Sequence, residues 1–122
     1  MWIMVGGPYG TGAKSAADRA ANLARMNAAA LAVFRKGHVP IIGVNMALPV
    51  IAAASGDAAS EAAIMMPLSL ALAERCDAFL RIGGRSVGAD QEMERFVAAG
   101  KTAFRRLEDV PQAAADRSVL HS

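Results

Sequence analysis

A short apolar run, a glycine-rich turn and a helical pattern follow one another in the second half of the chain, and this unit constrains the fold most. The run spans residues 77–82, and the turn at 83–91 holds three glycines. The apolar residues after the turn share one helical face: Met93, Phe96 and Val97. This order predicts a strand, a turn and a helix with Glu92 in its first turn. In open α/β sheets, ligands bind beside such turns, at the carboxyl ends of strands.

The rest of the chain repeats the same alternation. Apolar runs at 2–5, 41–44 and 102–107 predict three further strands, and helical patterns at 14–35 and 61–75 predict two further helices. The long helical pattern has a single continuous face, formed by Leu23, Met26, Asn27, Ala30, Leu31 and Phe34. The order β-α-β-α-β-α-β predicts a three-layer α/β fold, with a mostly parallel flavodoxin- or Rossmann-like sheet of four or five strands and helices on both faces.

Some segments leave the local structure open. Residues 50–59 are ambiguous, because alanine favours helix while Ser55-Gly56-Asp57 interrupts it. Before them, a loop is expected through Leu48-Pro49, and Pro67 predicts a kink in the helix at 61–75. The 122 residues suffice for one domain, which we assign to 1–110. The tail at 111–122 has a weak pattern that fits a short helix, a partner-contacting arm or a disordered segment.

Composition excludes several classes of function. A net charge of only +2 argues against binding a nucleic-acid polymer, which usually requires a basic face. Cys76 is the only cysteine, so no intrachain disulfide is possible, and a reducing cytoplasm is the expected location. No apolar run is long enough to span a bilayer, and residues 2–5 read as a strand and not as a signal peptide, so no membrane association is expected.

Motifs for common cofactors and metals fail on spacing. In the glycine-rich segment 7–15, Ala13 separates Gly12 from Lys14, whereas a P-loop requires the lysine directly after its second glycine. A dinucleotide fingerprint lacks its third glycine and the acidic residue after the second strand. The two histidines, His38 and His121, have no ligand neighbour at a suitable spacing. We therefore expect no cofactor and no metal.

Three loops with unusual composition follow the first three predicted strands. They contain Gly7-Pro8-Tyr9, Asn45 and Ser86-Val87-Gly88. Because parallel strands point the same way, these loops are expected on one rim, where they would form a small-molecule cleft. Glu92 would lean toward that cleft, since helical side chains point toward the N-terminus. There it could act as a base or nucleophile, or it could simply complement the helix dipole.

The chain resembles the nucleoside 2-deoxyribosyltransferase-like superfamily, which includes deoxynucleoside monophosphate N-glycosidases. The resemblance covers residues 3–107. It rests on four elements in order: Gly7-Pro8-Tyr9, Gly37-His38-Val39-Pro40, Ser86-x-Gly88-Ala89-x-x-Glu92 and Gly100-Lys101.

The resemblance implies an enzyme in which Glu92 attacks the anomeric carbon and releases the base. It also implies that Ser86 and the Gly88 backbone hold a 5′-phosphate or 5′-hydroxyl, with Arg85 able to add contacts to the phosphate. Gly7, Pro8 and Tyr9 would shape the floor of the pocket. The expected activity is N-glycosidic bond cleavage or deoxyribosyl transfer on a nucleoside or nucleoside 5′-monophosphate.

One departure from the family pattern bears on this expectation. Catalytic members carry an aspartate two helical turns before strand three, where this chain has Ser69. Asp57 or Glu61 could substitute for it. The alternative function is a non-catalytic binder of a nucleotide-like ligand, or an assembly module on the same fold. The resemblance also implies a homodimer or higher homo-oligomer, with the apolar helix at 62–73 as the expected contact surface.

Overall fold

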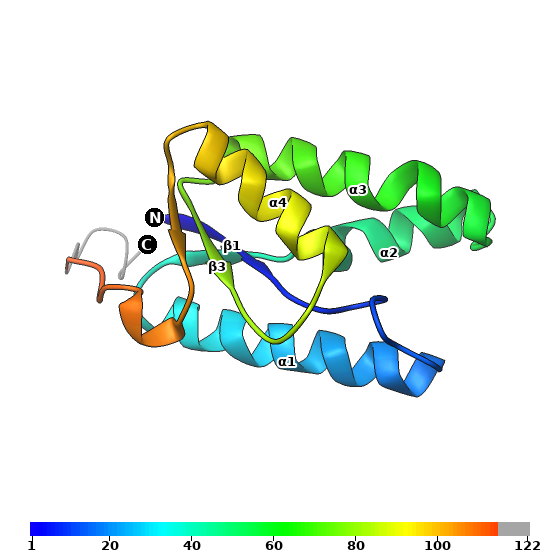
Figure 1. Cartoon of the computed structure of the whole chain (residues 1–122), viewed down its shortest axis with the longest axis horizontal. Coiled ribbons are helices and arrows are strands. Elements are labelled where there is room, and N and C mark those ends of the chain that lie inside the picture. Colours follow the sequence, from blue (N-terminus) through cyan, green and yellow to red (C-terminus); the bar gives the residue numbers. More distant parts are fainter. Residues whose placement is uncertain (115–122) are drawn as a thin grey trace.

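The computed structural model describes residues 1–114, which form a four-stranded sheet between two layers of helices (Figure 1). The strands are β1 (Trp2–Gly6), β2 (Val39–Ile41), β3 (Ala78–Arg81) and β4 (Thr102–Phe104). They lie in the order β2-β1-β3-β4, and every pairing is parallel. This arrangement confirms the predicted three-layer, Rossmann-like α/β fold, and the strand order is that of the first four strands of a flavodoxin-like sheet.

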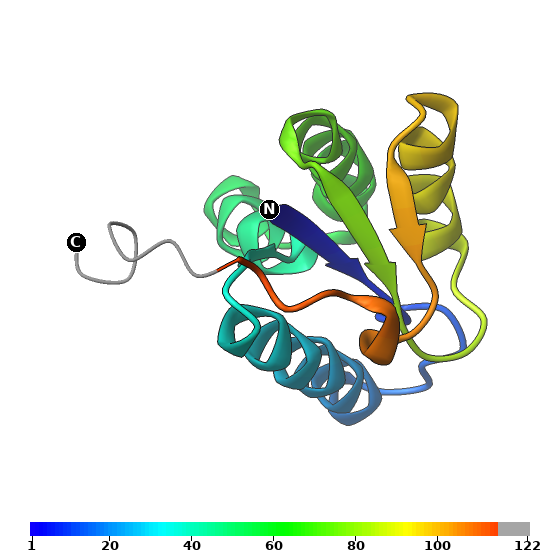
Figure 2. The same ribbon diagram turned by 90° about the vertical axis from the view of Figure 1, so that its left-hand side faces the viewer.

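Four α-helices cover the two faces of the sheet unequally. The helix α1 (Ala16–Arg35) lies on one face, as Figure 2 shows. The other three helices lie on the opposite face: α2 (Gly43–Ala54), α3 (Ala58–Arg75) and α4 (Val87–Ala98). A short 3₁₀ helix, η1 (Leu107–Asp109), follows β4. Right-handed crossovers account for the division, because the chain moves one way across the sheet from β1 to β2 and the other way from β2 to β4.

Each face of the sheet has its own hydrophobic core. The cluster toward α1 contains the buried residues Ile3, Val5, Met26, Val33, Ile42, Ala78, Leu80 and Val110. The cluster toward α3 and α4 contains Met4, Ala73, Cys76, Phe79 and Phe96. Alternate residues of β1 and β3 face the two clusters, so these central strands are apolar on both sides, as expected of a covered parallel sheet.

The second strand and the segment after it differ from the sequence prediction. The strand ends at Ile41, and Gly43 and Val44, predicted as strand, already belong to α2. The predicted loop through Leu48-Pro49 is wrong as well, because α2 continues through Pro49 to Ala54. Tertiary packing explains this result: Ala47 and Ile51, four residues apart on one face of α2, are buried.

The ambiguous segment after Pro49 is divided between two helices. Ser55 ends α2, and Gly56 turns the chain with a φ of 72°, a conformation that favours glycine. Asp57 then caps α3 by accepting a hydrogen bond from the Ser60 amide at 2.8 Å. Pro67 lies inside α3, which runs past it to Arg75.

The predicted apolar faces of α1 and α4 are only partly correct. Met26 is buried and Leu23 and Ala30 are half-buried, but Leu31 is 47% exposed and Phe34 is 64% exposed. The buried face of α1 passes instead through Val33. Because β2 is the edge strand, it gives the outer flank of α1 little to pack against. On α4 the face includes Met93 and Phe96, whereas Val97 is 61% exposed.

The segment after β4 is docked against the corner between α1 and β2. Lys36 Nζ donates hydrogen bonds to the carbonyl oxygens of Leu107 and Val110, both at 2.8 Å. The buried His38 ring contacts the Pro111 carbonyl oxygen through Nε2 at 2.7 Å. β4 is an edge strand, and it ends at Phe104 and not at Leu107 as predicted. Residues 111–114 are not helical, and the remainder of the predicted tail, with His121, lies outside the described residues.

Within the described residues, no helix is both long enough and apolar enough to cross a membrane.

Candidate functional site

The candidate site lies at the carboxyl edge of the sheet, where the loops after β1 and β3 meet the start of α2. The chain leaves β1 for β2 on one side, and β3 pairs with β1 on the other. The gap between the connections after β1 and β3 is therefore the topological switch point, where ligands bind in open α/β sheets. Because all the strands are parallel, the connections after β1, β2 and β3 lie on this one edge, although Asn45 belongs to α2 and not to a loop.

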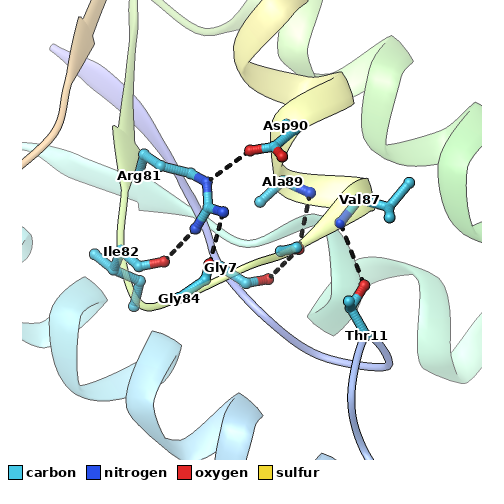
Figure 3. Close-up of polar contacts among 9 residues, drawn as sticks. Gly7, Thr11, Arg81, Ile82, Gly84, Val87, Ala89 and Asp90 are labelled. Atoms are coloured by element: carbon cyan, nitrogen blue, oxygen red, sulfur yellow. Dashed lines mark hydrogen bonds and ion pairs between the residues drawn. The ribbon is translucent and has the colours of Figure 1, made fainter.

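Ser86 joins two of these loops. Its hydroxyl caps α4 by accepting a hydrogen bond from the Ala89 amide at 3.1 Å, and it donates to the Gly7 carbonyl oxygen at 3.3 Å (Figure 3). A second link joins the Val87 amide to Thr11 Oγ1 at 3.2 Å. Ser86 is only 3% exposed. The start of α4 is thus held against the loop after β1 by a buried side chain.

Glu92 is the sixth residue of α4, so it lies in the second turn and not in the first turn as predicted, where the acid is Asp90. It shares a face of the helix with Ala89 and Phe96, and it is 8% exposed. Its carboxyl occupies space left by two glycines. A Cβ atom added to Gly6 would lie 2.9 Å from Glu92 Oε1, and one added to Gly43 would lie 3.3 Å from Oε2. The carboxyl therefore lies between the end of β1 and the first residue of α2, and it points inward from α4.

Burial controls the electrostatics of this carboxyl. Removal from water raises the pKa of Glu92 to about 7, while the positive charge of Arg81 acts in the opposite direction. Within residues 1–114, the Glu92 carboxyl makes no hydrogen bond. In the same part of the chain, every side-chain oxygen or nitrogen that is fully shielded from solvent does make one. The carboxyl oxygens therefore retain some contact with solvent. Near neutral pH the group exchanges between its acid and carboxylate forms.

Arg81, the last residue of β3, shapes the glycine turn and was not among the predicted site residues. Its guanidinium donates to the carbonyl oxygens of Ile82 and Gly84, the latter at 2.7 Å, and its Nε lies 3.2 Å from Asp90 Oδ1 (Figure 3). The side chain is only 12% exposed. A basic residue at the end of an otherwise apolar strand was the available signal in the sequence.

The loop after β1 forms the wall of the site beside α1 and β3. Gly7 is buried, and a Cβ added to it would lie 2.8 Å from Ile82 Cγ1. Pro8 packs against Gly83. The Tyr9 carbonyl oxygen accepts a hydrogen bond from Asn22 Nδ2 at 2.8 Å. Tyr9 itself packs on the core cluster toward α1.

The remaining predicted site residues do not gather around Glu92. Gly88 is close to α3, because a Cβ added to it would lie 3.4 Å from Met66 Sδ. Asn45 lies on the exposed side of α2, where its amide donates to Asn27 Oδ1 at 2.7 Å. Arg85 is exposed and lines a hollow on the outer side of the glycine turn. Gly7 and Ser86 are therefore brought together, whereas Asn45 and Arg85 lie at the periphery.

Two surface hollows are lined in part by residues of α4, and Glu92 lines neither of them. One, of about 510 Å³, lies between α3 and α4 and is lined by Met66, Pro67, Leu70, Gln91, Glu94, Arg95 and Ala98. The other, of about 360 Å³, is lined by Arg81, Gly83, Gly84, Arg85, Asp90, Met93 and Arg105.

Ser69 and the two acids considered as substitutes for an aspartate at its position, Asp57 and Glu61, lie in different places. Ser69 is buried and contacts Gly43, beside Glu92 Oε2. Asp57 is engaged in capping α3, and its hydrogen bonds to Ser60 lower its pKa. Glu61 lies 3.5 Å from Arg19, whose guanidinium in turn lies 5.8 Å from the centroid of the Tyr9 ring. Of the three, Ser69 is the residue that shares a neighbour with Glu92.

Neither protein-family models nor curated proteins give a match to this chain. Among residues 1–114, no group of three or more histidine, cysteine, aspartate or glutamate side chains is arranged to hold a metal ion.

Proposed function

We propose that this protein cleaves the N-glycosidic bond of a nucleoside or nucleoside 5′-monophosphate, with the Glu92 carboxylate as nucleophile. The observation that carries the proposal is the position of this carboxyl at the switch point of the sheet, between two glycines and with a raised pKa. Perturbed acids in such positions are typical of catalytic sites. The resemblance of Ser86-x-Gly88-x-x-x-Glu92 to the deoxyribosyltransferase-like superfamily supports the same chemistry.

The proposed reaction has two steps. In the first, a carboxylate oxygen of Glu92 bonds to the anomeric carbon as the bond to the base nitrogen breaks, and the base leaves with the electron pair and takes a proton from water. In the second, water attacks the anomeric carbon of the glycosyl ester, which releases the sugar and restores the carboxylate. A second base in place of water would give transfer. A carboxylate with few hydrogen bonds is a stronger nucleophile than a solvated one.

The surroundings of Glu92 supply groups for holding the substrate. The Val87 and Ala89 amides at the start of α4 already donate to Thr11 and Ser86, which leaves the Gly88 amide to favour an anionic 5′-phosphate, and Ser86 holds this helix end in place. Gly7, Pro8 and Tyr9 would line the sugar or base, with Asn45 at the rim. The positive charge of Arg81 favours the ionised form of Glu92, so Arg81 would be a positioning residue of the site.

A second candidate is the binding of a nucleotide-like ligand without catalysis. The observation that favours it is the burial of Glu92, which is only 8% exposed and lines neither surface hollow. In this case the acid would be a structural group, and Ser69 would replace the aspartate that the family uses on the sugar or leaving base.

Self-association is also proposed, as a homodimer or higher homo-oligomer. Five of the exposed large hydrophobic residues belong to the edge strand β2 or to the helices before and after it in the chain, α1 and α2, and we call this group the β2 flank: Leu31, Phe34, Val39, Met46 and Val50. The helix segment at 62–73 contributes no residue to the set of exposed large hydrophobics. The β2 flank is therefore the better contact surface.

We place the protein in a reducing compartment, the cytoplasm, because its one cysteine is a buried free thiol.

Release of free base from a panel of nucleosides and nucleoside 5′-monophosphates tests the enzymatic proposal. We expect at least one of them to be hydrolysed by the wild type and not by Glu92→Gln. Glu94→Gln is the matched control, because Glu94 is an exposed acid on the same helix. If no substrate turns over but a nucleotide raises the melting temperature of the wild type, the binding function is the correct one.

A further inference from the structure

The hollow on the outer side of the glycine turn has an unusual concentration of positive charge. Three arginines and one aspartate line it, Arg81, Arg85, Arg105 and Asp90, together with Gly83, Gly84 and Met93. Its volume of about 360 Å³ lies within the usual range of small-ligand sites. Glu92 does not line it, so the hollow is separate from the carboxyl proposed above as nucleophile.

The three arginines have different roles in this hollow. Arg81 is nearly buried, and each of its three guanidinium nitrogens donates a hydrogen bond, two to backbone carbonyl groups and one to Asp90. Arg85 and Arg105 are exposed, and within residues 1–114 neither makes a hydrogen bond or ion pair. Arg81 therefore builds the wall, while the two other guanidinium groups keep their donors available for a ligand.

We propose that this hollow binds a small phosphate-bearing anion through Arg85 and Arg105. The planar guanidinium fork matches the geometry of phosphate oxygens, and Asp90 neutralises only one of the three positive charges. The site comes from two connections that are adjacent in the sheet, because Arg85 follows β3 and Arg105 follows β4. Gly84, where an added Cβ would meet nothing within 4 Å, leaves the backbone accessible to a ligand oxygen. The inference does not depend on the proposed glycosidase activity.

Calorimetric titration with inorganic pyrophosphate tests the site, with a nucleoside 5′-monophosphate and the matching nucleoside as further probes. We expect pyrophosphate to bind the wild type and Glu92→Gln with equal affinity, and Arg85→Ala with Arg105→Ala to weaken binding at least tenfold. Arg106→Ala is the matched control, because Arg106 pairs with Asp109 at 3.3 Å and does not line the hollow. Asp90→Asn should tighten binding, since it removes the one negative charge.

The probes separate the two sources of phosphate. Binding of both pyrophosphate and the nucleotide, but not of the nucleoside, supports a site for the phosphate group wherever it is carried. Binding of the nucleotide alone, with the same loss in the double variant, supports a site for the phosphate of a nucleotide. The proposal is overturned if neither anion binds the wild type, or if the double variant, shown to be folded by its thermal unfolding, binds as tightly as the wild type.

Discussion

Glu92 lies against Gly6, the last residue of β1, so closely that a Cβ at residue 6 would come within 2.9 Å of the carboxyl oxygen Oε1. The helix after the third strand therefore directs an acid to the end of the first strand. This contact contributes to the burial of the carboxyl, and burial is what raises its pKa.

The raised pKa of Glu92 predicts that stability falls as pH rises. Between the unfolded pKa near 4.5 and the folded pKa of about 7, the native state keeps a proton that the unfolded state has released. The free energy of unfolding is therefore highest below the unfolded pKa and is lost as pH rises through 7, by roughly 3 kcal/mol in total. Urea unfolding at pH 5 and pH 8 should show this loss in the wild type and in Glu94→Gln, but not in Glu92→Gln. Equal pH dependence in all three proteins would contradict the assignment.

Gly6→Ala is expected to destabilise the protein by about 1–3 kcal/mol, because the new methyl group overlaps both the Phe79 ring and the Glu92 carboxyl. Gly10→Ala is the matched control, since a Cβ at Gly10 meets nothing within 4 Å. Denaturant midpoints compare the two variants. If Gly10→Ala proved as destabilising as Gly6→Ala, the close approach at the end of β1 would not be the cause.

Ser86→Ala and Ser15→Ala each remove an N-cap hydroxyl, and each should cost about 1 kcal/mol of stability. Only Ser86 also bonds to the Gly7 carbonyl oxygen in the loop after β1. The rate of base release should consequently fall in Ser86→Ala and remain unchanged in Ser15→Ala. Equal rates in the two variants, measured under conditions where both are folded, would show that the link to Gly7 has no part in the site.

The β2 flank predicts the oligomeric state. Light scattering of the wild type should give at least twice the 12.6 kDa of one chain. A variant with Phe34→Glu and Val50→Glu should give the mass of one chain, because charge is unfavourable in an apolar interface. Val97→Glu, at an exposed position on α4 outside this surface, should leave the wild-type mass unchanged. A wild-type mass of 12.6 kDa would rule out the proposed association.

The layered fold could be predicted because the buried strands β1 and β3 are short continuous apolar runs between helical patterns. The boundaries around α2 could not, because Val44, Leu48 and Ile51 suit a strand as well as a helix, and only packing on α3 and the sheet decides between them. Similarly, Leu31 and Phe34 fit the apolar periodicity of α1, but both side chains are exposed because the short edge strand β2 does not extend far enough to cover that side of the helix.

The site was predictable to a similar extent. The link between Ser86 and Gly7 follows from the order of the strands, and the inward direction of Glu92 follows from its place in the first turns of α4. The position of Arg81 at the end of an apolar strand could mark it as unusual, but its role depends on carbonyl groups that converge only in the folded turn. Arg105 comes to the same hollow as Arg85 only because β4 pairs with β3.

The central claim is that Glu92 acts as the nucleophile in base release, and the pH dependence of that reaction tests it most directly. With the best substrate of the panel, the wild-type rate should rise with pH to a plateau, with its midpoint near the Glu92 pKa of about 7, because only the carboxylate attacks. Glu92→Gln should release base at less than about a hundredth of the plateau rate. A Glu92→Gln protein that releases base at the wild-type rate, with the same pH profile, would contradict the account.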